Sequence, residues 1–245
     1  MFDSMGSILE ALSPEQQIAC STQNNILLTA CPGSGKTRTL THRLAYQVLR
    51  DPASKKIKIA ITYTNRAAEE ITNRLEGMNI DQSSIWAGTI HQFCMHFIIR
   101  PYAMYSKRLC KGYRIIDDYS KKAYGREIAE RLGMHLNYYD DPFQYENVRT
   151  EYKRVLKEKK EIDFDAILLI SEELLASCAF IGSNIASVIS SILVDEFQDT
   201  NELQYSILST IYKANKSITS SGRRSMRIVT GSSATFGAAP EPSGA

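Results

Sequence analysis

Residues 33–37 read Gly-Ser-Gly-Lys-Thr and are the part of the sequence best equipped for chemistry. An apolar run at 25–29 precedes this loop, and residues 38–50 follow it with the periodicity of a helix. In a strand–loop–helix unit of this kind, backbone N–H groups and the positive helix N-terminus surround the phosphates of a nucleotide. Lys36 supplies a cation and Thr37 a ligand for Mg²⁺. The pattern therefore predicts a nucleotide-phosphate loop rather than an ordinary Gly/Pro/Ser turn.

A second set of candidate residues follows the apolar run 185–194. Asp195 and Glu196 come directly after this run, and Gln198 lies two positions further on. The carboxyl ends of parallel strands share one edge of a sheet, so these carboxylates are expected beside the phosphate loop. There Asp195 would join the Mg²⁺ shell, and Glu196 would orient and deprotonate an attacking water. An acidic cluster after a strand is more often a helix N-terminus, but together with the phosphate loop it indicates a hydrolytic site.

The elements that must position these residues alternate between strands and helices. We expect further strands at 57–62, 84–87, the end of 185–194 and Met226–Val229, and helices at 38–50, 66–76, from 90 to about 99, and 163–175. Ser13 and Pro14 are typical of a helix start and predict a short helix within residues 8–19. Gly77 is expected to cap the helix at 66–76. The alternation predicts an α/β fold with a parallel sheet and helices on both faces.

Residues 100–160 interrupt this alternation and are predicted to form an inserted, mostly helical subdomain. They contain fifteen Lys and Arg against nine Asp and Glu, and nine of the thirteen tyrosines. Cations mixed with aromatic rings suit single-stranded nucleic acid, because phosphates pair with the cations and bases stack on the rings. A solvated helical surface over a small tyrosine-containing core explains the composition almost equally well. Both interpretations stay open.

The composition is that of an ordinary globular protein, with 43% hydrophobic residues, 23% charged residues and a net charge of +2 over 245 residues. Five scattered cysteines favour neither a disulfide framework nor a zinc site. No apolar run approaches the roughly 20 residues that a membrane helix needs, and no leader pattern opens the chain. The expected location is the cytoplasm, without a membrane partner.

Taken together, these residues resemble the first RecA-like half of the UvrD/Rep-type superfamily 1 DNA helicases, over most of the chain. Residues 194–200, Val-Asp-Glu-Phe-Gln-Asp-Thr, carry the most specific likeness. Residues 12–16, 61–68 and 88–94 resemble the Q motif, motif Ia and motif Ib of that family, and 163–165 match a helix start common in it. The resemblance implies a RecA-like P-loop NTPase sheet with an inserted helical subdomain.

The resemblance also implies the roles of individual residues. Gln16 would read the adenine, Arg38 would lie near the base, and Gln198 would couple the nucleotide state to DNA, which makes Lys36, Glu196 and Gln198 the catalytic set. The implied contacts are to ATP at Gln16, Ala30, Gly33, Ser34, Gly35, Lys36, Thr37 and Arg38, to Mg²⁺ at Thr37 and Asp195, and to single-stranded DNA at Tyr63, Asn65 and His91. The implied domains are the RecA-like part at 1–100 and 161–230, the inserted subdomain at 101–160 and a flexible tail at 231–245.

The sequence departs from the family in one motif. Residues 229–238 stand where motif III would lie, and they contain no glutamine to sense the γ-phosphate. No second RecA-like half is recognised. The expected function is the ATP-binding half of an ATP-dependent 3′-to-5′ DNA helicase or translocase on single-stranded DNA, weakly active or inactive unless a second half or partner protein completes it. The alternative is a degenerate nucleotide- and DNA-binding module. A small-molecule phosphotransferase with residues 100–160 as a lid explains fewer of the motifs.

Overall fold

The computed structural model describes residues 2–23, 25–29, 33–137, 139–219 and 228–232. The chain forms two compact units. The first unit combines residues 1–93 with residues 178–245, and the second unit is the intervening segment Cys94–Ser177. The subdomain boundaries expected from the sequence, 101–160, lie inside this second unit.

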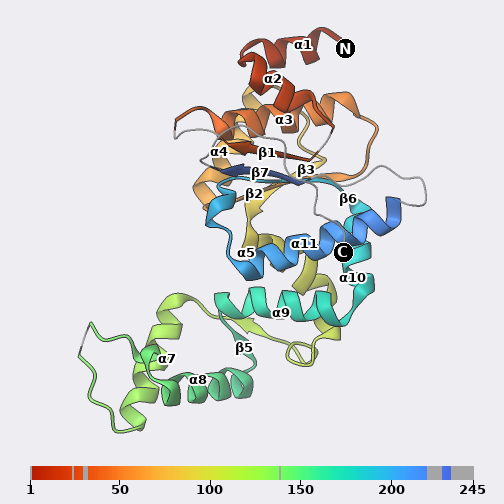
Figure 1. Ribbon diagram of the computed structural model, residues 1–245. Coiled ribbons are helices and arrows are strands. Elements are labelled where there is room, and N and C mark those ends of the chain that lie inside the picture. Colours follow the sequence, from red (N-terminus) through yellow and green to blue (C-terminus); the bar gives the residue numbers. More distant parts are fainter. Residues whose placement is uncertain (1, 24, 30–32, 138, 220–227, 233–245) are drawn as a thin grey trace, which may run out of the picture. The chain divides into compact units, whose positions relative to one another are not determined.

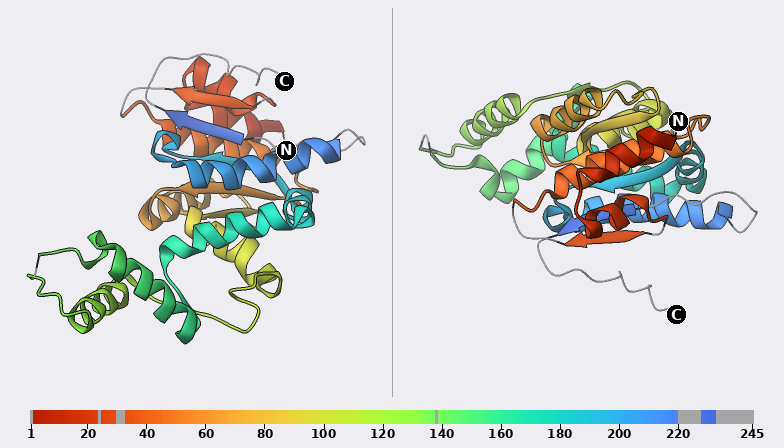
Figure 2. Two further views of the ribbon diagram at one scale, coloured as in Figure 1. Left: turned by 60° about the horizontal axis from the view of Figure 1, so that its bottom comes forward. Right: turned by 90° about the horizontal axis from the view of Figure 1, so that it is seen from above.

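A parallel β-sheet forms the centre of the first unit (Figure 1). Its strands, in spatial order, are β1 (Ile26–Thr29), β7 (Ile228–Ser232), β6 (Ile189–Val194), β2 (Ile57–Thr62) and β3 (Ile85–Thr89). Figure 2 shows β1 and β7 side by side although they are far apart in the sequence. In the middle of the sheet Ile61 lies opposite both Gly88 and Val194, so β2, β3 and β6 end at a common edge.

Helices lie on both faces of this sheet (Figure 1). The helices of the first unit are α1 (Phe2–Glu10), α2 (Pro14–Ser21), α3 (Lys36–Arg50), α4 (Asn65–Gly77), α5 (Ile90–Phe93), α10 (Ala179–Val188) and α11 (Glu202–Thr219). The α/β fold with a parallel sheet, predicted from the alternation of patterns, is confirmed. No described helix has the length and hydrophobicity that a membrane span requires.

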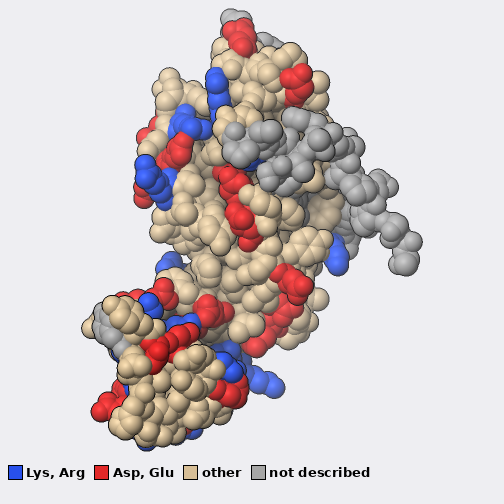
Figure 3. All heavy atoms as spheres, turned by 60° about the vertical axis from the view of Figure 1, so that its left-hand side comes forward, with Lys and Arg blue, Asp and Glu red and all other residues tan. Residues whose placement is uncertain are grey.

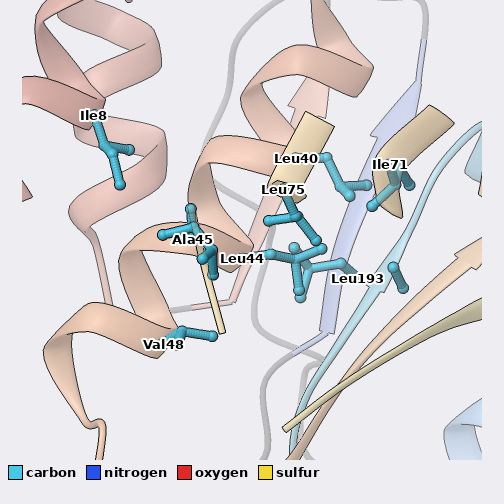
Figure 4. Close-up of a cluster of buried hydrophobic side chains, with 10 residues drawn as sticks. Ile8, Leu40, Leu44, Ala45, Val48, Ile71, Leu75 and Leu193 are labelled. Carbon is cyan, nitrogen blue, oxygen red and sulfur yellow. The ribbon is translucent and has the colours of Figure 1, made fainter. Parts of the chain in front are cut away.

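An apolar cluster fixes α3 against the sheet and against α1 and α4 (Figure 4). Leu40, Leu44 and Val48 recur at helical spacing along α3 and face Leu75 of α4 and Leu193 of β6. Leu44 is fully buried, and each buried leucine of this kind stabilises the fold by about 1.5–3 kcal/mol. Because α3 begins at the phosphate loop, this packing holds the loop at the edge of the sheet.

Three local predictions are corrected. The helix start predicted at Ser13 and Pro14 is confirmed, because α2 begins at Pro14 with Ser13 in a capping box with Gln16, but the bounds 8–19 are wrong, since residues 8–10 belong to α1 and α2 continues to Ser21. Gly77 is the last residue of α4 and not its cap, because the left-handed conformation that ends the helix belongs to Asn79, with φ 54°. The single apolar helix expected from residue 90 to about 99 is α5 followed by a π-helix at Cys94–Ile99.

The second unit has its own core and charged surface. After the π-helix, its elements are α6 (Arg100–Tyr102), β4 (Arg114–Ile115), α7 (Asp118–Arg131), α8 (Glu146–Lys159), β5 (Glu161–Ile162) and α9 (Phe164–Ser177), with short 3-10 turns at Ala103–Tyr105 and Pro142–Gln144. A cluster that includes Ile128, Val148 and Tyr152 packs α7 against α8. Cations and carboxylates intermingle on the face drawn in Figure 3.

The predictions for residues beyond 220 are tested only in part. The strand expected at Met226–Val229 is β7, which runs from Ile228 to Ser232, whereas residues 226 and 227 lie outside the described residues. Gly231 and Ser232 belong to this strand, so the tail predicted at 231–245 is wrong at its first two positions. Residues 233–245 lie outside the described part of the chain.

Candidate functional site

The phosphate-loop residues from Gly33 onward lie at the N-terminus of α3. Gly33 and Gly35 have φ values of 79° and 85°, in the left-handed region that side chains avoid. Gly35 is the N-cap of α3, so Lys36 and Thr37 open the helix where its backbone N–H groups have no intrahelical partner. This arrangement suits an anion. Ala30, the first predicted position of the loop, lies outside the described residues.

Thr37 and Asp195 meet although 158 positions separate them. The Thr37 hydroxyl donates a hydrogen bond to Asp195 Oδ2 at 2.9 Å. Asp195 follows β6 directly and is buried, and this burial raises the pKa of its carboxyl although the Thr37 hydrogen bond opposes the rise. The sequence predicted that both residues would lie at one edge of the sheet, and the structure brings their side chains into contact.

The donor set at this contact fits Mg²⁺. A hydroxyl and a carboxylate are hard oxygen ligands, and Mg²⁺ in nucleotide sites takes only one or two protein carboxylates because it keeps several waters and binds phosphate oxygens. Among the residues that the structure describes, no group of three or more His, Cys, Asp and Glu side chains could hold a metal ion. A site built from Thr37, Asp195 and nucleotide phosphates needs no such group.

Glu196 adopts an unusual backbone conformation beside this contact. Its φ of 51° and ψ of 46° are left-handed, which is uncommon for a residue other than glycine and is often found at functional sites. Gln198 Nε2 donates a hydrogen bond to Glu196 Oε2 at 2.6 Å, so the amide holds the carboxylate that was predicted to activate water. A short 3-10 turn, Phe197–Asp199, follows in place of the α-helix start that was the alternative interpretation.

Gln16 lies next to the phosphate loop. Its Nε2 donates to the Ser34 carbonyl at 3.1 Å, while its Oε1 accepts a hydrogen bond from the Ser13 backbone N–H at 3.1 Å. Arg38, the other residue expected near the base, donates from Nη2 to the Ala11 carbonyl at 2.9 Å. Gln16 therefore connects the phosphate loop to α2, and Arg38 connects α3 to the segment that joins α1 and α2.

The residues expected to contact DNA follow the carboxyl ends of two neighbouring strands. Tyr63 comes directly after β2 and is 65% exposed, Asn65 begins α4, and His91 lies in the first turn of α5 after β3. Because β2, β3 and β6 end at a common edge, all three lie on the side of the sheet where Asp195 lies. A cavity of about 20 Å³ is lined by Tyr63 as well as by Asp195 and Glu196.

Sequence reasoning missed the residues that shape the start of α5. Thr89 and Gln92 cap this helix reciprocally, because the Thr89 N–H donates to Gln92 Oε1 at 2.8 Å and the Gln92 N–H donates to Thr89 Oγ1 at 3.3 Å. The spacing Thr-x-x-Gln could have revealed this capping box. A Cβ atom at Gly88 would lie 2.7 Å from the Trp86 ring, so this position requires glycine. These contacts fix the backbone at the start of α5, where His91 lies.

The second unit contains a large pocket of about 1520 Å³. Seven cations among its lining residues form no ion pair within the described part of the chain, namely Lys107, Arg108, Lys111, Lys122, Lys153, Lys157 and Lys160. Lys153, Lys157 and Lys160 recur at helical spacing from α8 onward, and Lys160 Nζ donates to the Lys111 carbonyl at 3.5 Å. These cations outnumber the lining carboxylates that likewise form no ion pair in the described residues, Asp118, Asp140, Asp141 and Glu173, so the net unpaired charge of the pocket is positive.

A comparison of the chain with models of protein families identifies its family. The model of the UvrD/REP helicase N-terminal domain matches residues 12–143 and 136–222. The chain belongs to this family. The matched segments contain the phosphate loop, Thr37 and Asp195.

Curated relatives agree with this assignment. The chain is 27% identical over 228 residues to an ATP-dependent DNA helicase PcrA from Leuconostoc citreum, and 27% identical over 227 residues to DNA helicase II from Escherichia coli strain K12. A PcrA helicase from Staphylococcus aureus strain Mu50 is 25% identical over 244 residues. These alignments cover 81%, 81% and 87% of this chain, but only 30%, 31% and 33% of the respective relatives. The chain thus spans about a third of their length.

Proposed function

We propose that this chain is the ATP-binding, RecA-like part of an ATP-dependent DNA helicase or translocase that moves 3′ to 5′ on single-stranded DNA. The observation that carries the proposal is the hydrogen bond between Thr37 and Asp195, which joins two distant motifs at one edge of a parallel sheet. Two of the relatives are named ATP-dependent DNA helicases and one is named DNA helicase II, which supports the same activity.

The phosphate loop would hold the nucleotide by its phosphates. The left-handed glycines expose backbone N–H groups at the start of α3, and Lys36 adds a cation at the same helix end. Thr37 and Asp195 are the residues that would hold Mg²⁺, which when bound neutralises charge on the phosphates. Gln16 and Arg38 would contact the base side of the nucleotide, next to the loop that Gln16 already contacts through Ser34.

Glu196 would act as the general base for ATP hydrolysis. The left-handed backbone turns the chain sharply after β6 and places this carboxylate next to Asp195. The Gln198 amide donates to one carboxylate oxygen, which orients the carboxylate and leaves the other oxygen to take a proton from the attacking water. If DNA binding moved the Gln198 amide away from Glu196, the orientation of the carboxylate would change, and the nucleotide state would thereby be connected to DNA.

Single-stranded DNA would run along the carboxyl edge of the sheet past Tyr63, Asn65 and His91. An exposed tyrosine provides a face on which a base can stack, whatever the base sequence. Because Tyr63 shares a cavity lining with Asp195 and Glu196, DNA binding there could alter the hydrolytic carboxylates directly. The unpaired lysines in the pocket of the second unit favour the nucleic acid interpretation of this basic segment as well.

Replacement of Lys36 tests the phosphate site. Lys36→Ala should remove most of the affinity for MgATP in titration calorimetry, because Lys36 is the one cationic residue in the loop sequence 30–37 and opens α3. Arg50→Ala is the matched control, since Arg50 is the exposed last residue of the same helix. Equal MgATP affinity of Lys36→Ala and the control would show that the phosphate loop is assigned wrongly.

A second candidate function is a nucleotide- and DNA-binding module without productive hydrolysis. The absence of glutamine from residues 229–238, where the family's motif III is expected, favours this candidate. The two functions differ in ATP turnover with and without single-stranded DNA. Stimulation of turnover by DNA supports the helicase proposal, whereas tight binding of both ligands without turnover supports the binding module.

A further inference from the structure

Polar side chains of α3 bind the backbone carbonyls at the ends of α1 and α2. His42 Nδ1 donates to the Ile8 carbonyl at 2.7 Å, and Arg43 Nη1 donates to the Ala19 carbonyl. Cys20 Sγ in turn donates to the Thr39 carbonyl of α3 at 3.4 Å. Helix α3 is thus joined to α1 and α2 by directed hydrogen bonds in addition to apolar packing.

These hydrogen bonds go to carbonyls that the helices cannot satisfy themselves. Ile8 lies in the last turn of α1 and Ala19 in the last turn of α2, where carbonyls have no intrahelical partner. A cation or a ring N–H is favourable at such helix ends. Burial lowers the pKa of His42, so its neutral ring donates from Nδ1 at neutral pH.

The burial of Arg43 indicates that its position is specific. Arg43 is 1% exposed and is among the largest fully buried side chains of the described residues. Placing a guanidinium in an interior is costly unless it is hydrogen-bonded, and an apolar side chain could fill the same space without that cost. The contact with Ala19 therefore fixes α2 more precisely than packing alone would.

The helix that Arg43 anchors carries Gln16. The N-terminal end of α2 is formed by the Ser13–Gln16 capping box, and Gln16 Nε2 reaches the Ser34 carbonyl of the phosphate loop. The C-terminal end of α2 is held by Arg43. Without the second anchor, α2 is held mainly at its N-terminal end, so a tilt of the helix strains the hydrogen bond between Gln16 and Ser34 and loosens Gln16 beside the loop.

We propose that Arg43 is a positioning residue for base recognition, because it holds α2 so that Gln16 faces the purine of the nucleotide. The inference rests on the proposed ATP site. The groups that would bind the triphosphate lie outside α2, since the loop glycines, Lys36 and Thr37 belong to α3 and the preceding loop. Loss of Arg43 should therefore weaken recognition of the base and leave recognition of the phosphates unchanged.

The test compares MgATP with magnesium tripolyphosphate, which has the triphosphate but no base. Arg43→Met keeps an apolar chain of similar length while removing the guanidinium. We expect it to weaken MgATP binding about tenfold, equivalent to about 1.4 kcal/mol, to leave tripolyphosphate affinity unchanged and to reduce the preference for ATP over GTP. Arg43→Lys should recover part of the loss, because it keeps a cationic donor. Arg50→Met is the matched control on the same helix.

A double-mutant cycle with Gln16→Ala separates positioning from general destabilisation. If Arg43 acts through Gln16, Arg43→Lys weakens MgATP binding in the wild-type background and has little effect in the Gln16→Ala background. Equal losses for MgATP and tripolyphosphate, or additive effects in the cycle, would overturn the inference. If Arg43→Met does not fold, Arg43→Lys and the cycle still decide. If the wild-type chain binds neither ligand, the proposed ATP site itself is wrong.

Discussion

Replacing Asp195 with asparagine should make the ligand-free chain more stable and abolish its response to Mg²⁺. Asp195 is 7% exposed, and burial raises the pKa of its carboxyl above the ordinary value of 3.8, with the neighbouring Glu196 carboxylate adding to the rise. Asparagine has the same shape: its Oδ1 can keep the hydrogen bond from the Glu196 N–H, and its Nδ2 can donate to the Thr37 hydroxyl, which then accepts instead of donating. The substitution therefore removes a buried negative charge and changes little else.

The size of the effect follows from the hydrogen bonds of Asp195. A buried charged group without partners costs about 1–3 kcal/mol or more, but Asp195 accepts hydrogen bonds from Thr37 and from the Glu196 N–H. We therefore expect Asp195→Asn to raise the free energy of unfolding by about 1 kcal/mol, the lower end of this range. For a chain of this size that corresponds to a rise of about 2–4 °C in the unfolding midpoint. Because the folded carboxyl has the raised pKa, the free energy of unfolding falls as pH rises from 3.8 through that raised pKa. The free energy of unfolding of Asp195→Asn lacks this fall, so the variant exceeds the wild type in stability most at neutral pH.

Thermal unfolding followed by circular dichroism checks both parts of this prediction. The wild-type midpoint should rise when MgATP is added, whereas the Asp195→Asn midpoint should start higher and respond little to Mg²⁺. Asp199→Asn is the matched control, because Asp199 is exposed and lies in the turn after the site. A lower midpoint for Asp195→Asn without ligand would refute the reasoning from burial. An undiminished Mg²⁺ response would remove Asp195 from the metal site.

Three further changes test the hydrolytic, DNA-binding and structural parts of the chain. Glu196→Gln should leave MgATP affinity intact and slow hydrolysis by about 10²–10⁴, the usual contribution of a general base; an unchanged single-turnover rate contradicts that role. Tyr63→Ala should weaken single-stranded DNA binding by about 1–3 kcal/mol in fluorescence anisotropy, and equal affinity would place the DNA elsewhere. Leu44→Ala should lower the free energy of unfolding by about 2–5 kcal/mol in a urea titration. Leu169→Ala, at a half-exposed site, should cost much less, and equal losses at the two sites would contradict the burial argument.

The sequence predicted correctly those features that a local residue pattern or the geometry of a parallel sheet determines. The strand expected at residues 57–62 has the observed bounds of β2, and the helix expected at 66–76 is α4, which Thr64 caps. The meeting of Thr37 and Asp195 was also predictable, because the carboxyl ends of parallel strands share an edge whatever the order of the strands. The chemical roles of these two residues remain predictions.

Other features depend on information that no local pattern contains. The position of β7 between β1 and β6 is set by pairing between strands that are distant in sequence. His42 and Arg43 are polar, so helical periodicity assigns them to the solvent side of α3, whereas α1 and α2 cover them. The choice of Asn79 over Gly77 as the left-handed residue depends on where packing ends α4.

The strand order also has a consequence for how the chain folds during its synthesis. Among the described strands β1 is the first to leave the ribosome, yet it pairs only with β7, the last. The pairs of β2 with β3 and of β2 with β6 can form earlier, since their partners are made before β7. Pairing over such a long sequence separation is slow, because a long loop must close first. We therefore expect the strand that leads into the predicted phosphate loop to join the sheet last, so that a nascent chain acquires the proposed nucleotide site only when all the described strands have been made.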